Sequence, residues 1–186
     1  MTTKIIIING KGKSGKDTVI NWIKSNFNDI NIYNFSSIDP SKQAAEIFGC
    51  YGKSDRDRKF LSKLKELSIW YNDHPTIYLY KQIKSIYTTN NIVFLHIREA
   101  EEIEKMRTLL YEKSYDAYTL YIHRNINDYG NKSDDNVENY VYDYYIDNSK
   151  EFEYTIQDIK KFLTFIGMRY DESKYIEKSN TGGREE

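Results

Sequence analysis

Residues 4–18 have the sequence KIIIINGKGKSGKDT, which predicts a buried strand, a glycine-rich turn and the start of a helix. The four isoleucines within residues 4–9 form a continuous β-branched run, as in strands that are covered on both faces. From residue 16 the apolar residues recur at helical spacing and share one face: Val19, Ile20, Ile23 and Phe27. We therefore expect a strand–turn–helix unit at the start of the chain.

The turn in this unit, residues 10–18, matches the phosphate-loop pattern G-x-x-x-x-G-K. Its glycines let successive backbone N–H groups point inward and form an anion nest, and the helix start adds its positive dipole end. Lys16 would bridge the β- and γ-phosphates of a bound nucleotide. The alternative is a turn without a ligand, but the flanking strand and helix are the context that the pattern requires. We expect ATP to contact these residues: Lys11, Gly12, Lys13, Ser14, Gly15, Lys16, Asp17 and Thr18.

Asp17 stands where the pattern usually has Ser or Thr, whose hydroxyl contacts magnesium. A carboxylate can also hold Mg²⁺, directly or through water, because this ion favours one or two carboxylates together with substrate phosphates. A simpler interpretation is that Asp17 complements the positive end of the helix dipole, and both can be true together. We expect Asp17 to bind the metal and Thr18 to help place it.

The rest of the chain alternates strands with helices, which predicts an α/β fold with a doubly wound parallel sheet. Further strands are expected at residues 32–35, 91–97, 118–123 and 142–146. Helices are expected at residues 41–48, 55–71, 76–87, 99–110 and 155–166. Residues 1–176 would form one domain, in which the polar segment 125–139 is either a mobile lid or a plain surface loop. The tail 177–186 has a composition typical of disorder.

The string GKGKSGKDT resembles the phosphate loop of two related groups, phage-type deoxynucleoside monophosphate kinases and animal-type phosphomevalonate kinases. Residues 35–49 are similar to the deoxynucleotide kinase segment in which an Asp-Pro and a Lys precede an Ala-rich helix. Residues 97–99 resemble the strand-end arginine of that family, and residues 133–134 and 142–148 resemble its ending. Asp134 replaces an expected Glu, and Ile97 replaces an expected Asp. The resemblance implies a P-loop NTPase fold of the nucleoside monophosphate kinase type, with ATP and Mg²⁺ as cofactors.

Arginines at strand ends are the candidates for catalysis, because phosphoryl transfer needs cations around the transferring group. Arg98 follows a buried strand at its carboxyl end, where α/β sheets keep their ligand sites, although it could instead be a surface residue paired with Glu101 or Glu102. Arg124 ends another strand and would close over the phosphates, or else lie in a solvated loop. With Lys16, these two arginines form the expected catalytic set.

The expected acceptor site draws on the helical region 36–88. Asp39 and Lys42 follow the second strand, where Lys42 could hold the acceptor phosphate, although Asp39-Pro40 could simply be a turn and helix cap. Arg56 and Arg58 lie at the start of a helix, where positive charge is unfavourable because of the helix dipole. They could therefore serve to bind an acceptor phosphate, or they could simply form a solvated face. The resemblance adds Ser133 and Asp134 to the expected acceptor residues. His96 and His123 lie in apolar strands and are interpreted as core residues, not as site residues.

The charge balance, the cysteine content and the lack of long apolar stretches argue against several other classes of protein. The chain has 27 Lys and Arg against 28 Asp and Glu, a net charge of −1, and therefore lacks the basic excess of nucleic-acid-binding proteins. Cys50 is the only cysteine, which excludes an internal disulfide and favours a reducing compartment. We find none of the roughly 18-residue apolar stretches that span membranes. We expect a cytoplasmic protein, in the host cytoplasm if it is phage-encoded, and a monomer or a homodimer.

The leading functional hypothesis is ATP-dependent phosphorylation of a deoxynucleoside monophosphate to the diphosphate. A first alternative is the same chemistry on another small phosphate ester, such as phosphomevalonate. A second alternative, from a different class, is a regulatory protein that binds nucleotide without transferring phosphate.

Overall fold

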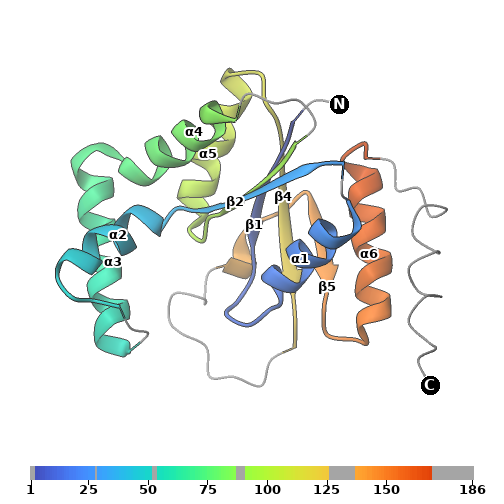
Figure 1. The fold of residues 1–186 in the computed structure, drawn as a ribbon, viewed down its shortest axis with the longest axis horizontal. Coiled ribbons are helices and arrows are strands. Elements are labelled where there is room, and N and C mark those ends of the chain that lie inside the picture. Colours follow the sequence, from blue (N-terminus) through green and yellow to red (C-terminus); the bar gives the residue numbers. More distant parts are fainter. Residues whose placement is uncertain (1–2, 28, 52–53, 87–90, 126–136, 169–186) are drawn as a thin grey trace, which may run out of the picture.

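The computed structural model describes residues 3–27, 29–51, 54–86, 91–125 and 137–168 (Figure 1). The strands are β1 (Lys4–Asn9), β2 (Asn31–Ser36), β3 (Asn91–His96), β4 (Asp116–His123) and β5 (Tyr144–Asp147). The helices are α1 (Lys16–Asn26), α2 (Asp39–Ile47), α3 (Asp55–Asn72), α4 (His74–Ser85), α5 (Ala100–Glu112) and α6 (Phe152–Phe165), with a 3₁₀ helix η2 (Val137–Asn139) before β5. None of the helices described has the length and apolar character needed to cross a membrane.

The strands form one sheet in the order β2-β3-β1-β4-β5, and every neighbouring pair within the described residues is parallel. The central strand β1 pairs with β3 on one side, where Ile8 lies opposite His96, and with β4 on the other, where Asn9 lies opposite Tyr121. After β1 the chain first builds the β2–β3 side of the sheet and later the β4–β5 side. The carboxyl end of β1 is therefore the topological switch point, where such sheets bind ligands.

Helices cover both faces of the sheet, as the alternation of side chains along β1 requires. Ile6 and Ile8 point to the face that is covered by α1 and α6, in a core that includes Val19 and Phe162. Ile5 and Ile7 point to the opposite face, covered by α4 and α5. All four isoleucines are buried, which explains the unbroken apolar run of this strand. The predicted α/β fold with a doubly wound parallel sheet is confirmed.

Figure 1 shows α2 and α3 extending sideways from the sheet, beyond β2. Helix α3 packs on α2 and α4 rather than on the sheet. Two residues of its predicted apolar face are consequently exposed, Leu67 by 58% and Tyr71 by 77%. The charged residue Lys65 is buried instead.

Most of the predicted element boundaries differ from the observed ones by one to three residues. The second helix begins at Asp39 rather than Ser41, because Pro40 is compatible with the first turn of a helix. The last strand begins at Tyr144 rather than Tyr142, and ends at Asp147.

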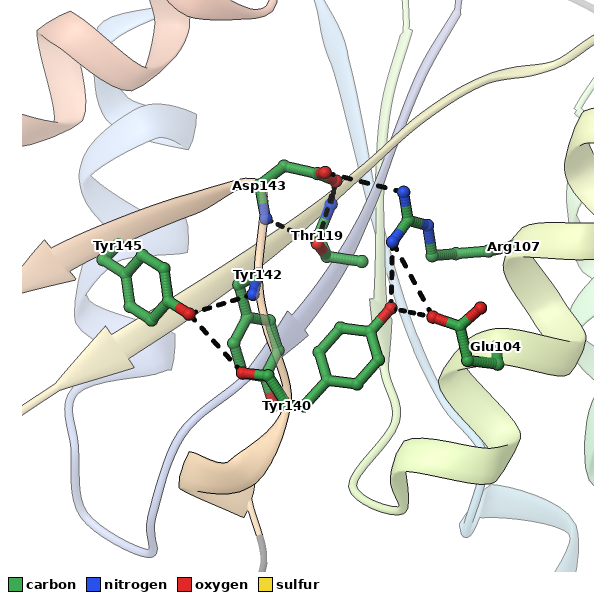
Figure 2. Close-up of polar contacts among 7 residues, drawn as sticks. All are labelled: Glu104, Arg107, Thr119, Tyr140, Tyr142, Asp143 and Tyr145. Carbon is green, nitrogen blue, oxygen red and sulfur yellow. Dashed lines mark hydrogen bonds and ion pairs between the residues drawn. The ribbon is translucent and has the colours of Figure 1, made fainter.

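The start of β5 is fixed by a polar network that ties it to β4 and α5 (Figure 2). The Asp143 carboxylate accepts hydrogen bonds from the backbone N–H of Thr119 at 2.7 Å and from its hydroxyl at 2.8 Å. Arg107 of α5 lies 3.5 Å from the same carboxylate and donates to the Tyr140 hydroxyl at 3.0 Å. Tyr140 in turn donates to Glu104. The chain between η2 and β5 is thereby held against α5.

Candidate functional site

The phosphate loop, residues 10–18, follows β1 and leads into α1, and two of its glycines are required by the geometry. Gly15 has a φ of 93°, in the left-handed region that side chains disfavour, and a Cβ there would come within 2.2 Å of the Asn148 amide nitrogen. A Cβ on Gly10 would come within 2.5 Å of the Ile122 carbonyl oxygen and 2.6 Å of the Ser14 hydroxyl. The loop is therefore packed against the carboxyl ends of β4 and β5.

Lys16 is the first residue of α1, and its side chain folds back over the phosphate loop. The ammonium donates to the carbonyls of Gly10 at 2.6 Å and Lys11 at 2.9 Å, and to the Ser14 hydroxyl at 3.3 Å. A cation is thus held inside the loop, next to the positive end of the α1 dipole. This loop joins the central strand of a parallel 2-3-1-4-5 sheet to the first helix. The fold is that of a P-loop NTPase.

Asn148, directly after β5, is hydrogen-bonded to the phosphate loop at the carboxyl end of the sheet. Its amide nitrogen donates to the Ser14 carbonyl at 2.9 Å, and its side-chain oxygen accepts from the Thr155 hydroxyl at 3.1 Å. Its backbone N–H donates to the His123 carbonyl at 2.7 Å. Sequence reasoning assigned Asn148 no role, although it ends the 142–148 segment that carries the family resemblance. Its contact with the loop spans 134 positions, so no local pattern could reveal it.

Asp17 and Thr18 occupy the first turn of α1, and both are exposed. Together they offer a carboxylate and a hydroxyl, and the Thr18 hydroxyl lies 3.9 Å from where a Cβ on Gly15 would stand. This oxygen donor set fits Mg²⁺, which takes few protein ligands beside substrate phosphates and water. No group of three or more His, Cys, Asp or Glu able to hold a metal occurs in the part of the chain that the structure describes.

Arg98 follows β3 and is exposed, and the backbone around it is fixed. Its carbonyl accepts a hydrogen bond from the Asn9 side chain at 2.9 Å. The next residue, Glu99, pairs with Lys65 of α3 at 2.5 Å, and Lys65 also pairs with Glu102 at 2.8 Å. Glu102, which was one expected partner of Arg98, is therefore engaged by Lys65.

The Lys65 ammonium acts differently on its two carboxylates. Burial favours the neutral form of Glu99, but the charge and hydrogen bond of Lys65 outweigh it and lower the pKa of that carboxyl. Burial dominates at Glu102 and raises its pKa, and its second oxygen is buried without a hydrogen-bond partner. Glu102 is thus the buried carboxylate of the pair, whereas the Glu99 side chain is 51% exposed.

His96, the last residue of β3, lies between β1, which leads into the phosphate loop, and β2, which leads into the expected acceptor region. It is half-buried, and its Nε2 lies 2.7 Å from the Asn34 side-chain oxygen. Burial, and next the positive charge of Lys16, lower the pKa of His96 to about 4, so the ring is neutral at pH 7. Charges on Asp39 and Lys42 of α2 also act on it. The strand register places the same groups there: Ile8, just before the phosphate loop, and Ser36, just before α2, both lie opposite His96.

The interpretation of both strand histidines as core residues is wrong. His123 is half-buried at the last position of β4, and its Nε2 lies 3.1 Å from the Asn125 side-chain oxygen. Like His96, it lies at the carboxyl end of its strand, where the chain leaves the core and a polar ring can meet both a partner and solvent.

The expected acceptor residues have the following surroundings. The Asp39 carboxylate accepts from the Ser36 N–H at 2.8 Å, which closes the turn before α2, and from the Lys42 ammonium at 3.3 Å. It does not cap the helix, because α2 has Ile38 at its cap position and no side-chain cap hydrogen bond. Lys42 is exposed on α2, and Arg56 and Arg58 are exposed on the first turn of α3, where Arg58 lies 3.9 Å from the Asp55 carboxylate. Ser133 and Asp134 lie outside the described residues.

The expected lid, residues 125–139, is described only at its two ends. Arg124 precedes it and is exposed at the end of β4. At the other end, η2 buries Val137, and Glu138 forms an ion pair with Lys11 of the phosphate loop at 2.9 Å. The carboxyl end of the segment is thus docked on the loop.

No protein-family model and no curated protein matches the chain. Among solved structures, a cysteine mutant of the APS kinase CysC from Mycobacterium tuberculosis is 15% identical, with a TM-score of 0.47 over 88% of this chain and 98% of that one. The same kinase in complex with AMPPNP and APS is 13% identical, with a TM-score of 0.49 over the same shares. A de novo designed protein of P-loop NTPase fold is 13% identical, with a TM-score of 0.43 over 90% of this chain and 94% of that one.

Proposed function

We propose that this protein is an ATP-dependent phosphotransferase that phosphorylates a small phosphorylated acceptor, and that the acceptor is a deoxynucleoside monophosphate. The observation that supports this most directly is the Lys16 ammonium, which lies within hydrogen-bond reach of three loop oxygens at the start of α1. A polyphosphate would take over these contacts, because its oxygens carry full charge and the loop amides and helix dipole add to the attraction.

The proposed reaction needs positioning and positive charge more than covalent chemistry. An acceptor phosphate oxygen attacks the γ-phosphorus of ATP, and the bond between that phosphorus and the β–γ bridging oxygen breaks, leaving ADP. Lys16, Arg98 and Arg124 would neutralise the transferring group. The acceptor is already an anion near neutral pH, so no general base is required. Mg²⁺, held by Asp17 and Thr18, would neutralise charge on the β- and γ-phosphates.

The acceptor would lie between the carboxyl end of β3 and the helices α2 and α3. Support comes from the strand register, in which His96 at the end of β3 lies opposite Ile8, next to the phosphate loop, and opposite Ser36, next to α2. Lys42 is exposed at the start of α2 and would bind the acceptor phosphate, with Arg56 and Arg58 of α3 as further cations. The resemblance to deoxynucleoside monophosphate kinases favours a nucleotide over other phosphate esters.

The test is a panel of acceptors incubated with ATP and Mg²⁺, with formation of ADP and of phosphorylated product both measured. We expect turnover with at least one common deoxynucleoside monophosphate. Turnover only with another phosphate ester would refute the nucleotide acceptor, and tight ATP binding without turnover on any acceptor would refute the transferase. A folded sample that binds no ATP by calorimetry would refute nucleotide binding itself.

The matched variants are Lys16→Ala and Lys24→Ala, because both lysines belong to α1 but Lys24 is an exposed residue in its last turn. We expect Lys16→Ala to lower kcat by about three orders of magnitude while the protein stays folded. Lys24→Ala should keep the wild-type rate. Near-normal activity of Lys16→Ala would contradict the mechanism.

A further inference from the structure

Asn9, the last residue of β1, has a fully engaged side chain at the centre of the molecule. It is only 1% exposed. Its side-chain oxygen accepts from the Gly10 N–H at 2.8 Å, and its amide nitrogen donates to the Arg98 carbonyl at 2.9 Å and to the Tyr142 hydroxyl at 2.8 Å. A carboxamide has two N–H donors, and both are used here.

These bonds join three segments that are far apart in the sequence. Gly10 begins the phosphate loop, Arg98 follows β3, and Tyr142 precedes β5. The Tyr142 hydroxyl extends this hydrogen-bond network to η2, because it donates to the Val137 carbonyl at 2.9 Å. The backbone at Arg98 is thus held from two sides, by Asn9 at its carbonyl and by the Lys65–Glu99 pair at the next residue.

We propose that Asn9 is a positioning residue for the transfer reaction, which holds the Arg98 backbone in fixed register with the first glycine of the phosphate loop. This inference rests on the proposed function, since it needs Arg98 to contact the transferring group. Its physical basis is that a flexible arginine side chain neutralises a moving charge well only when its Cα is fixed relative to the phosphates. Asn9 links those two points through a single carboxamide.

Other residue types at this position would break the link. Aspartate would keep the acceptor for Gly10 but lose the donors for Arg98 and Tyr142, and would bury a negative charge. Leucine has the same branched shape and the same number of side-chain heavy atoms, although its methyl groups are larger, so it would remove every hydrogen bond without burying a charge. Asn9→Leu is therefore the cleaner perturbation.

Tyr142→Phe is the matched control. It removes one of the two bonds that the Asn9 nitrogen donates and leaves the bond to Arg98 intact. The phenylalanine ring would stay in place, because the Tyr142 ring is packed against Tyr121, Tyr140 and Tyr145 with centroid distances of 5.0, 4.8 and 5.8 Å. Figure 2 shows this ring close to Tyr140 and Tyr145. Both variants thus disturb the same buried network.

The experiment is a double-mutant cycle on kcat between Asn9→Leu and Arg98→Ala, with saturating ATP and acceptor. We expect Asn9→Leu to lower kcat by about ten- to a hundredfold in the wild-type background, and by less than about twofold when Arg98 is already alanine. Tyr142→Phe should stay within about twofold of the wild-type kcat. Thermal unfolding of each variant verifies that the assays are made on folded protein.

The outcomes separate this inference from the function on which it rests. Equal losses in both Arg98 backgrounds would mean that Asn9 acts on stability or on the loop alone, and would overturn the proposal. A kcat for Tyr142→Phe as low as that of Asn9→Leu would overturn it too. Absence of turnover in the wild-type protein with every acceptor would instead reject the proposed function, and the role of Asn9 with it.

Discussion

The contact between Gly15 and Asn148 allows a quantitative prediction, because two costs can be assigned separately. A Cβ on Gly15 would lie 2.2 Å from the Asn148 amide nitrogen and 3.4 Å from its Cγ, so Gly15→Ala has to displace that side chain. Displacement breaks the bonds of Asn148 to the Ser14 carbonyl and the Thr155 hydroxyl, which together stabilise the fold by about 2 kcal/mol. The left-handed φ of 93° adds about 1–2 kcal/mol.

Gly15→Ala should therefore lower the free energy of unfolding by about 3–4 kcal/mol, and Asn148→Ala by about 2 kcal/mol. In the double variant the Asn148 side chain is already absent, so the new methyl group displaces nothing. The free energy of unfolding then falls only by the contribution of the Asn148 hydrogen bonds and the cost of the left-handed φ at residue 15. The double variant should lose about 3–4 kcal/mol rather than the sum of about 5–6 kcal/mol.

Urea unfolding followed by circular dichroism measures these values, with equal m-values as the condition for comparing variants. Fully additive losses would refute the reasoning, since they would mean that Asn148 does not meet the new methyl group. A loss below about 1 kcal/mol for Gly15→Ala would contradict the assigned backbone conformation as well.

Two further predictions concern buried ionisable groups. Lys65→Met should destabilise the protein by about 3–5 kcal/mol in urea unfolding at pH 7, because it leaves the buried Glu102 carboxylate without its cation. Lys65→Met combined with Glu102→Leu should recover most of that loss, and no recovery would contradict the reasoning. His96 has a folded-state pKa of about 4, below the ordinary value of 6.5, so the unfolded chain binds the proton first as the pH falls. Between pH 6.5 and 4 the wild type should therefore lose about 2–3 kcal/mol more than His96→Gln, and parallel pH profiles of unfolding would exclude this contribution.

The sequence predicted the architecture because the fold depends on local patterns. The unbroken isoleucine run predicted a strand covered on both faces, and β1 is the central strand. The apolar spacing of α1 predicted the face that is buried against the sheet. The apolar spacing of α3 was less informative, because that helix packs on other helices and leaves Leu67 and Tyr71 exposed.

The contacts that hold the candidate site could not be predicted in the same way. Asn9 and Tyr142 are 133 positions apart, and Asn148 and Ser14 are 134 apart, so only the folded sheet brings each pair together. The histidines show a related difficulty. Apolar neighbours suggested core positions for His96 and His123, but each is the last residue of its strand, and the carboxyl end of the strand leaves room for a polar ring. The assigned roles of Lys16, Arg98 and Arg124 remain predictions.

The hydrogen bond between Asn148 and the phosphate loop also has a consequence for the order in which parts of this protein fold. During synthesis the loop leaves the ribosome among the first residues. Asn148, which hydrogen-bonds to it, follows about 130 residues later, a delay of roughly ten seconds at common elongation rates. Contacts of such high sequence separation form late, because the intervening chain must lose its entropy first. Nascent chains that end before β5 would contain the complete phosphate loop but not Asn148, which hydrogen-bonds to it. We therefore expect a rigid phosphate loop to be one of the last features of this molecule to form.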